Sequence, residues 1–320
     1  MLDDKILTYF KGKTGNYVSG EDVAESFGIS RAAVWKHIEK FREEGYEIEA
    51  LPHLGYKLVS APDRLSEMEL KWKLNTGIIG KKIYSYKEID STNDAAYKLA
   101  VSGAPEGTCV VSEYQTKGRG RLGRKWISPK DKGAYLSIIL RPDIPPNEAG
   151  MVTLFSALAI ANSIRETVSL PAFIKWPNDV FINEKKVCGI LTEMNGELDK
   201  IHFVVIGIGI NINAKTELLP EGATSLAEEK GEQVSRLEFT QALLRNLDKY
   251  YNLFNRKSLE DIVAEYKKLC LVLDKQVQIH YDNELISGNA VDIDKEGALI
   301  LRMDSGFQKR VLAGDVVMLR

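Results

Sequence analysis

The chain has 320 residues, a formal net charge of −2 at pH 7 and a hydrophobic fraction of 44%. This length allows two or three globular domains, and the near-neutral charge excludes a protein that is basic overall. The longest apolar stretch, near residues 151–161, is too short to span a membrane, and the first residues lack the pattern of a secretion signal. The three cysteines form no C-x-x-C pair, so we expect no disulfide framework, no metal site and a cytoplasmic protein.

Residues 1–62 have the pattern of a winged helix-turn-helix DNA-binding domain. Ser19 can cap a helix, Gly28 predicts a turn, and two short β-rich runs predict a hairpin around residues 52–55. Ser30 can cap a second helix. The outward face of this second helix, with its cap, offers residues that could contact DNA: Ser30, Arg31, Ala32, Trp35 and Lys36.

The overall charge of this N-terminal segment does not itself favour DNA. Residues 1–62 contain eight lysines and arginines against ten aspartates and glutamates, a net charge of −2. A small helical protein-interaction domain is therefore the alternative. The pattern still favours DNA binding, because the acidic residues lie away from the start of the predicted recognition helix.

Residues 63–270 mix predicted strands and helices without a regular βαβ alternation, which indicates an α+β domain with a mixed sheet. Polar residues 90–94 open a predicted helix, and hydroxyls and free N–H groups at a helix start suit a polar ligand. Simple helix capping would explain one of these residues. Glycine alternates with isoleucine over residues 207–210, which predicts that a ligand or another backbone lies against that face of a strand.

A glycine- and arginine-rich loop runs from Gln115 to Trp126, directly after a predicted strand. It holds three glycines and five basic side chains in twelve residues, which favours binding of a phosphate or carboxylate. The spacing of Gly118, Gly120 and Gly123 also fits a dinucleotide-binding fingerprint, but no helix can open at residues 125–129. A solvated basic loop is the other alternative, and three interleaved glycines argue against it.

Residues 271–320 contain short alternating apolar runs that are separated by turn residues. About fifty residues of this kind predict a small SH3-like β-barrel. The expected organisation is therefore three domains, at 1–62, 63–270 and 271–320.

Five motifs, taken in order, resemble those of the biotin–protein ligases. They are DSTN at 90–93, QTKGRGRLGRKW at 115–126, KWPND at 175–179, KVCGIL at 186–191 and GIGIN at 207–211. With its winged helix, the chain is similar to the bifunctional members, which also repress a biotin operon. Leu122 stands where a polar residue would also be expected.

The resemblance implies an enzyme that makes biotinyl-5′-AMP from biotin and ATP, with Mg²⁺, and transfers biotin to a lysine of a biotin carboxyl carrier protein. It also implies a repressor that binds operator DNA with biotinyl-5′-AMP as corepressor. Because one winged helix reads only one half-site, we expect the adenylate to promote a homodimer.

The resemblance also implies roles for single residues. Biotin would be bound by Ser91, Thr92, Asn93, Gln115, Arg119, Gly120, Arg121 and Lys186. Arg121 and Lys186 would be the catalytic residues, and Trp126, Asn211 and Arg124 would bind the ATP part of the adenylate. Asp179 could accept a proton from the incoming lysine, or it could be a structural cap of the turn at Pro177.

Two other functions stay open at this point. One is a ligand-sensing transcription factor that binds but does not catalyse, which the presence of Arg121 and Lys186 disfavours. The other is a ligase for a related acid such as lipoate, because pocket shape would decide between the two acids.

Overall fold

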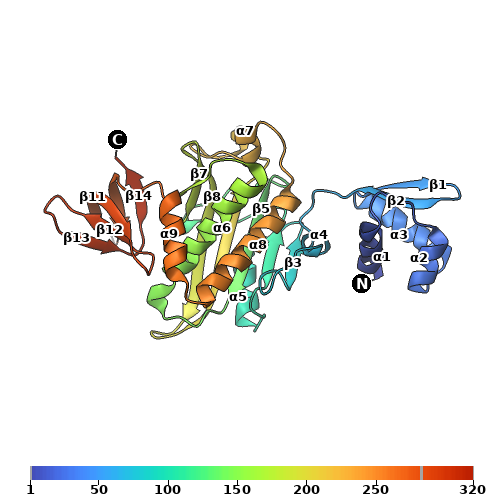
Figure 1. The fold of residues 1–320 in the computed structure, drawn as a ribbon, viewed down its shortest axis with the longest axis horizontal. Helices are drawn as coiled ribbons and strands as arrows, with labels where there is room; N and C mark the ends of the chain where they lie inside the picture. Colours follow the sequence, from blue (N-terminus) through green and yellow to red (C-terminus); the bar gives the residue numbers. More distant parts are fainter. Residues whose placement is uncertain (1, 282–283, 320) are drawn as a thin grey trace. The chain divides into compact units, whose positions relative to one another are not determined.

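The computed structural model describes residues 2–281 and 284–319. Contacts divide the chain into two compact units, Met1–Arg64 and Leu65–Arg320. Figure 1 shows the elements of both units in chain order. The proposed 63–270 and 271–320 domains both fall almost entirely within the second unit.

The first unit is the expected winged helix-turn-helix. Its elements are α1 (Leu2–Gly12), α2 (Gly20–Phe27), α3 (Arg31–Glu43), β1 (Glu47–Leu51) and β2 (Gly55–Ser60). Ser19 and Ser30 cap α2 and α3, because their hydroxyls accept hydrogen bonds from Glu21 N and Ala33 N. Gly28 ends α2 with φ 63°, a left-handed conformation that glycine adopts without strain.

The second unit is built on a seven-stranded mixed sheet in the order β3-β4-β5-β9-β8-β7-β6. Only the β3–β4 pair within this sheet is parallel. The strands are β3 (Ile83–Tyr86), β4 (Cys109–Ser112), β5 (Gly133–Leu140), β6 (Phe173–Lys175), β7 (Asp179–Ile182), β8 (Lys185–Gly196) and β9 (Ile201–Asn211). The central strands β8 and β9 therefore carry the predicted KVCGIL and GIGIN motifs side by side.

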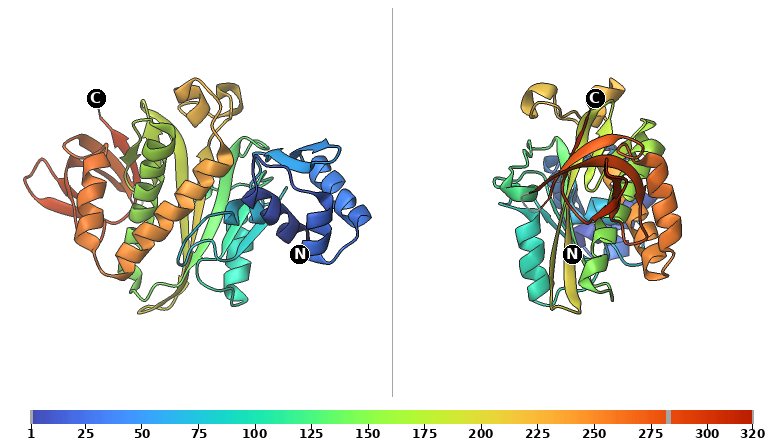
Figure 2. Two further views of the ribbon diagram at one scale, coloured as in Figure 1. Left: turned by 45° about the vertical axis from the view of Figure 1, so that its right-hand side comes forward. Right: turned by 90° about the vertical axis from the view of Figure 1, so that its left-hand side faces the viewer.

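Helices cover both faces of this sheet, as the edge-on view in Figure 2 shows. One face packs against α6 (Gly150–Val168), α8 (Arg236–Asn255) and α9 (Leu259–Leu269), while α5 (Thr92–Val101) lies on the other. Two short helices complete this part, α4 (Glu67–Lys71) and α7 (Leu226–Lys230). A short 3-10 turn at Pro146–Glu148 directly precedes α6.

The C-terminal residues form a five-stranded antiparallel sheet in the order β13-β12-β11-β10-β14. The strands are β10 (Gln276–Tyr281), β11 (Glu284–Ile293), β12 (Leu299–Arg302), β13 (Gln308–Val311) and β14 (Asp315–Met318). Among the helices described within 2–281 and 284–319, none is long and apolar enough to cross a membrane.

Candidate active site and DNA-binding surface

One cavity above strands β8 and β9 brings together every residue that the sequence predicted to bind biotin or the adenylate. Its lining includes Ser91, Thr92, Asn93, Gln115, Arg119, Gly120, Arg121, Arg124, Trp126, Lys186 and Asn211. These residues come from the start of α5, the loop after β4, and the strands β8 and β9. Residues of β8 and β9 line the same cavity because the two strands are neighbours, with Gly189 paired with Gly209.

Glycines in the sheet make room for protein side chains at this cavity. A Cβ on Gly209 would lie 2.4 Å from the indole of Trp126, and a Cβ on Gly207 would lie 2.0 Å from Asn93 Oδ1. The glycine–isoleucine pattern predicted that a ligand or another backbone lies close to this strand. In the structure the nearest atoms to these two glycines belong to the side chains of Trp126 and Asn93, which lie over the bare face of β9 and form part of the cavity wall.

Hydroxyl and amide groups line the end of the cavity next to α5. Gln115 Oε1 accepts hydrogen bonds from Thr92 N (2.9 Å) and Thr92 Oγ1 (3.0 Å), and Gln115 Nε2 donates to Ser128 Oγ (3.0 Å). The buried hydroxyl of Ser137 lies 2.6 Å from Asn93 Oδ1 and 2.8 Å from Thr92 Oγ1. Ser137 was not predicted, although a serine within the apolar strand β5 was a visible signal.

The glycine–arginine loop folds into a small hairpin over the cavity, which we call the arginine hairpin (residues 118–126). Backbone hydrogen bonds join Gly120 N to Arg124 O (2.7 Å) and Trp126 N to Gly118 O (2.9 Å). Its tip is a 3-10 turn at Arg121–Gly123. Leu122, within this turn, has a side chain directed to solvent, with 74% of its surface exposed. The presence of leucine at position 122, where a polar residue would also be expected, therefore changes no group that lines the cavity.

Two arginines of the hairpin, Arg121 and Arg124, bind protein groups on the side of β7 and β14. Arg121 Nη1 donates to Asn178 Oδ1 (2.6 Å) and to Gly314 O (3.3 Å). Arg124 forms an ion pair with Asp315. Gly314 and Asp315 were not predicted, because nothing in the sequence relates the last strand to the glycine–arginine loop.

A second cationic group lies below the hairpin. Lys186 Nζ is 2.8 Å from Asp179 Oδ1 and 5.6 Å from the centre of the Trp126 ring. Burial lowers the pKa of the nearby Lys175 ammonium, and the charge of Lys186 lowers it further, although Asp179 opposes both effects. Asp179 therefore lies beside the turn at Pro177 and also pairs with a cationic group of the cavity.

Two polar atoms of the cavity wall are buried and have no hydrogen-bond partner among the described residues. They are Trp126 Nε1, a donor, and Asn211 Oδ1, an acceptor, whereas Asn211 Nδ2 is bound to Thr224 O (3.1 Å). Buried polar groups without partners are costly, so this donor and this acceptor are the atoms of the cavity wall with hydrogen-bonding capacity left for a ligand or a water molecule. The adjacent apolar wall of Leu219, Pro220 and Ala223 was not predicted.

The predicted DNA-contacting residues share one surface of the first unit. Ser30, Arg31, Ala32 and Lys36 are exposed, and Trp35 exposes 54% of its surface. This face belongs to α3, whose opposite face buries apolar residues. Such a helix can present side chains to a groove of DNA.

Comparison with known proteins matches all three parts of the chain. The family model described as "Biotin/lipoate A/B protein ligase family" matches residues 85–211. Models described as "HTH domain" and "Biotin protein ligase C terminal domain" match residues 4–57 and 272–319. The chain is thus similar to a ligase domain with a DNA-binding motif before it and a ligase-type domain after it.

The chain is also similar to whole proteins and to a solved structure. The bifunctional ligase/repressor BirA of Bacillus subtilis is 38% identical over 319 residues, which cover 98% of each chain. The protein of the same name from Escherichia coli is 31% identical, over 94% of this chain and 93% of its own. A solved structure of the biotin protein ligase from Aquifex aeolicus in complex with biotin and ATP is 31% identical, with a TM-score of 0.64 over 75% of this chain and 99% of that chain.

The chain has a mixed-sheet domain with a cationic, partly apolar cavity, and a winged helix precedes it. These features define the class of protein ligases that also carry a DNA-binding domain. Within that class, the chain belongs to the family of bifunctional ligase/repressors of the biotin protein ligase type. The resemblance and the fold class expected from the sequence are therefore confirmed.

Proposed function

We propose that the cavity above β8 and β9 makes biotinyl-5′-AMP from biotin and ATP and then transfers biotin to a lysine of a biotin carboxyl carrier protein. The observation that carries this proposal is the meeting of three kinds of group in one cavity. They are a hydrogen-bonding end at Thr92 and Gln115, cationic groups at Arg121 and Lys186, and an unpartnered donor and acceptor at Trp126 and Asn211.

In the first step, a carboxylate oxygen of biotin attacks the α-phosphorus of ATP, and the bond from that phosphorus to the bridging oxygen breaks to release pyrophosphate. Negative charge gathers at the reacting phosphate, so preorganised cations stabilise the transition state. Arg121 and Lys186 fit this role because their positions are fixed by Asn178 and Asp179. Adenine would lie by Trp126 and Leu219, and its amino group would donate to Asn211 Oδ1.

In the second step, a neutral carrier lysine attacks the acyl carbon of the adenylate, AMP leaves, and the lysine nitrogen loses a proton. Asp179 could accept this proton, because its carboxylate lines the cavity. Its ion pair with Lys186 supports a second role, which is to hold that ammonium at the reacting carboxyl–phosphate junction.

In the part of the chain that the structure describes, no cage of side chains surrounds a site for the magnesium ion that normally accompanies ATP. Among the described residues, no group of three or more His, Cys, Asp or Glu side chains could hold a metal. Asp179 and Asp315, the carboxylates that line the cavity, each pair with a cation. We therefore derive no step through a protein-bound metal; Mg²⁺ would enter with ATP, held by phosphate oxygens.

We infer that the first unit binds operator DNA through the exposed face of α3, and that biotinyl-5′-AMP acts as corepressor by promoting a homodimer. Two copies on a two-fold axis could read a palindromic site, whereas one winged helix reads one half-site. The carrier protein would compete with the second copy, so demand for biotinylation would relieve repression. We propose a cytoplasmic protein, because these activities need access to both carrier protein and DNA.

Biotin-dependent exchange of labelled pyrophosphate into ATP tests the adenylation step. We expect exchange with biotin and little or none with lipoate. Exchange that needs no acid, or that prefers lipoate, would overturn the proposed substrate.

Sedimentation equilibrium with and without biotinyl-5′-AMP, together with operator binding, tests the corepressor role. We expect the adenylate to strengthen both the dimer and the operator complex. A dimerisation constant and an operator affinity that are both unchanged by the adenylate would refute this role and leave the ligase proposal intact.

A further inference from the structure

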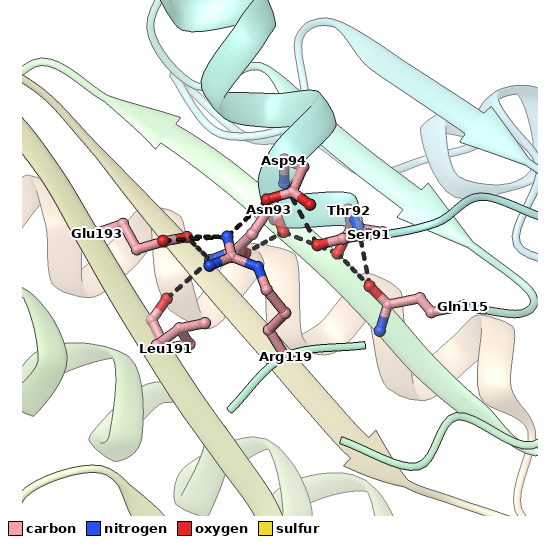
Figure 3. A network of polar contacts seen from close by, with 9 residues as sticks. Ser91, Thr92, Asn93, Asp94, Gln115, Arg119, Leu191 and Glu193 are labelled. Carbon is pink, nitrogen blue, oxygen red and sulfur yellow. Dashed lines mark hydrogen bonds and ion pairs between the residues drawn. The ribbon is translucent and has the colours of Figure 1, made fainter. Parts of the chain in front are cut away.

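The guanidinium of Arg119 is held by two carboxylates on separate elements. Its Nη2 donates to Asp94 Oδ1 (2.6 Å) on α5, and to Glu193 Oε2 (2.9 Å) and Oε1 (3.0 Å) on β8. Figure 3 shows Arg119 reaching across the sheet between these two acids. Its charge is therefore already neutralised by protein groups, unlike that of a residue held ready only for a substrate carboxylate.

Glu193 also binds the polar end of the cavity. Glu193 Oε2 accepts a hydrogen bond from Asn93 Nδ2 (2.8 Å), which also donates to Leu191 O (3.3 Å). Asn93 Oδ1 accepts from Ser137 Oγ (2.6 Å). Both donors and the acceptor of the Asn93 amide are thus used within the protein, so Asn93 is suited to fix the position of Glu193.

The arginine hairpin is therefore tied down along both of its arms. Arg119, on the first arm, binds α5 and β8, while Arg124, on the second arm, binds Asp315. These two attachments lie on opposite sides of the hairpin tip, Arg121–Gly123. Without the first attachment, this arm would be held only by its backbone hydrogen bonds to the second arm and no longer by side-chain contacts with α5 and β8.

We propose that Asp94 and Glu193 are positioning residues that act through Arg119 to hold the arginine hairpin closed over the cavity. In the closed position, the hairpin keeps the adenylate from leaving before the carrier lysine arrives. The retention part rests on the proposed function, whereas closure of the hairpin does not.

We call Arg119, Asp94 and Glu193 together the arginine clasp. The strength of its ion pairs depends on how far these side chains are exposed to solvent. The side chains of Arg119, Asp94 and Glu193 are 43%, 47% and 28% exposed, so solvent screens the ion pairs and each contributes modestly. Two carboxylates on one guanidinium form a small network, which contributes more than an isolated surface pair. We therefore expect an effect that falls as salt concentration rises.

The experiment compares Asp94→Asn, Glu193→Gln and the double variant with the unmodified chain. Glu193→Gln keeps an oxygen for Asn93 and removes the charge that Arg119 needs. The control is Glu67→Gln, which breaks an exposed ion pair with Lys71 on α4. Two rates are measured: tryptic cleavage within residues 118–126 of the ligand-free protein, and release of biotinyl-5′-AMP.

Each single variant should speed both rates by about two- to fivefold, and the double variant by about tenfold, as expected for partly exposed ion pairs. Glu67→Gln should change neither rate. In an Arg119→Gln background, Glu193→Gln should have no further effect, because the clasp acts through Arg119.

Unchanged cleavage and release in the double variant would overturn the proposal. An equal effect of Glu193→Gln with and without Arg119 would also overturn it, because Glu193 would then act by a different route. Faster cleavage in a protein that makes no biotinyl-5′-AMP would support the clasp and refute the proposed function, so the two failures are distinguishable.

Discussion

The ammonium nitrogen of Lys186 lies 2.8 Å from Oδ1 of Asp179, on two neighbouring strands that pair through Val180 and Cys188. The pair fixes a positive charge at the edge of the cavity, 5.6 Å from the ring of Trp126. This charge can be removed without removing the length of the side chain, by Lys186→Met.

Lys186→Met should slow adenylation by about 10²–10³-fold, because a preorganised charge that stabilises a transition state contributes on that order. Its unfolding free energy should change by no more than about 1 kcal/mol, since the ammonium is partly exposed. Lys185→Met is the matched control: its side chain is 57% exposed and outside the cavity lining. Single-turnover adenylation that stays near the unmodified rate in Lys186→Met would show that Lys186 is not catalytic.

Gly209→Ala should weaken ATP binding, because the new Cβ would lie 2.4 Å from the Trp126 indole and the ring would have to move. We expect the KM for ATP to rise by about tenfold, which corresponds to about 1.4 kcal/mol of binding free energy. The KM for biotin should change less. Gly12→Ala provides the control, since nothing lies within 4 Å of a Cβ there. An unchanged KM for ATP would argue that the position of the indole does not matter for nucleotide binding.

Replacing Arg31 and Lys36 together by alanine should weaken operator binding and reduce its dependence on salt. Each phosphate contact contributes roughly −0.9 to the slope of log affinity against log salt. Titrations at several salt concentrations measure this slope, and Lys13→Ala, which removes an exposed charge outside α3, is the control. If the double variant keeps both affinity and slope, α3 is not the recognition helix.

Asp294→Asn should destabilise the protein near neutral pH but not in acid. Burial raises the pKa of the Asp294 carboxyl, but hydrogen bonds from Arg310 and from the N–H groups of Ala298 and Glu296 outweigh burial and leave the pKa below its ordinary value. A lowered carboxyl pKa contributes stability above the unfolded pKa, and this contribution is lost as pH falls through the folded pKa.

Urea unfolding at pH 7 should therefore show Asp294→Asn to be less stable by about 1 kcal/mol, a value reduced for the partial exposure of the ion pair. The difference from the unmodified chain should shrink as pH falls through the lowered pKa of Asp294. Asp304→Asn, at an exposed turn, serves as control. A difference that stays constant from neutral to strongly acidic pH would contradict the charge-based explanation.

The sequence by itself determined the features that depend on neighbours along the chain. Ser19, Ser30 and Ser91 cap helices because a hydroxyl at a helix start reaches N–H groups two or three residues later. The order of the motifs was enough to indicate the family, and every predicted ligand residue lines one cavity. These signals are short-range or additive along the chain, so the sequence carries them directly.

Only the tertiary structure decided which carboxylate forms an ion pair with which arginine. Glu193 binds Arg119 and Asp315 binds Arg124 across separations of 74 and 191 residues, and no local pattern selects these partners. The sheet order sets them, because placing β8 beside β9 brings Asn93, Glu193 and the glycines of β9 to one face. Side-chain pairing depends on positions fixed to within about 0.5 Å, and packing of the whole sheet supplies that precision.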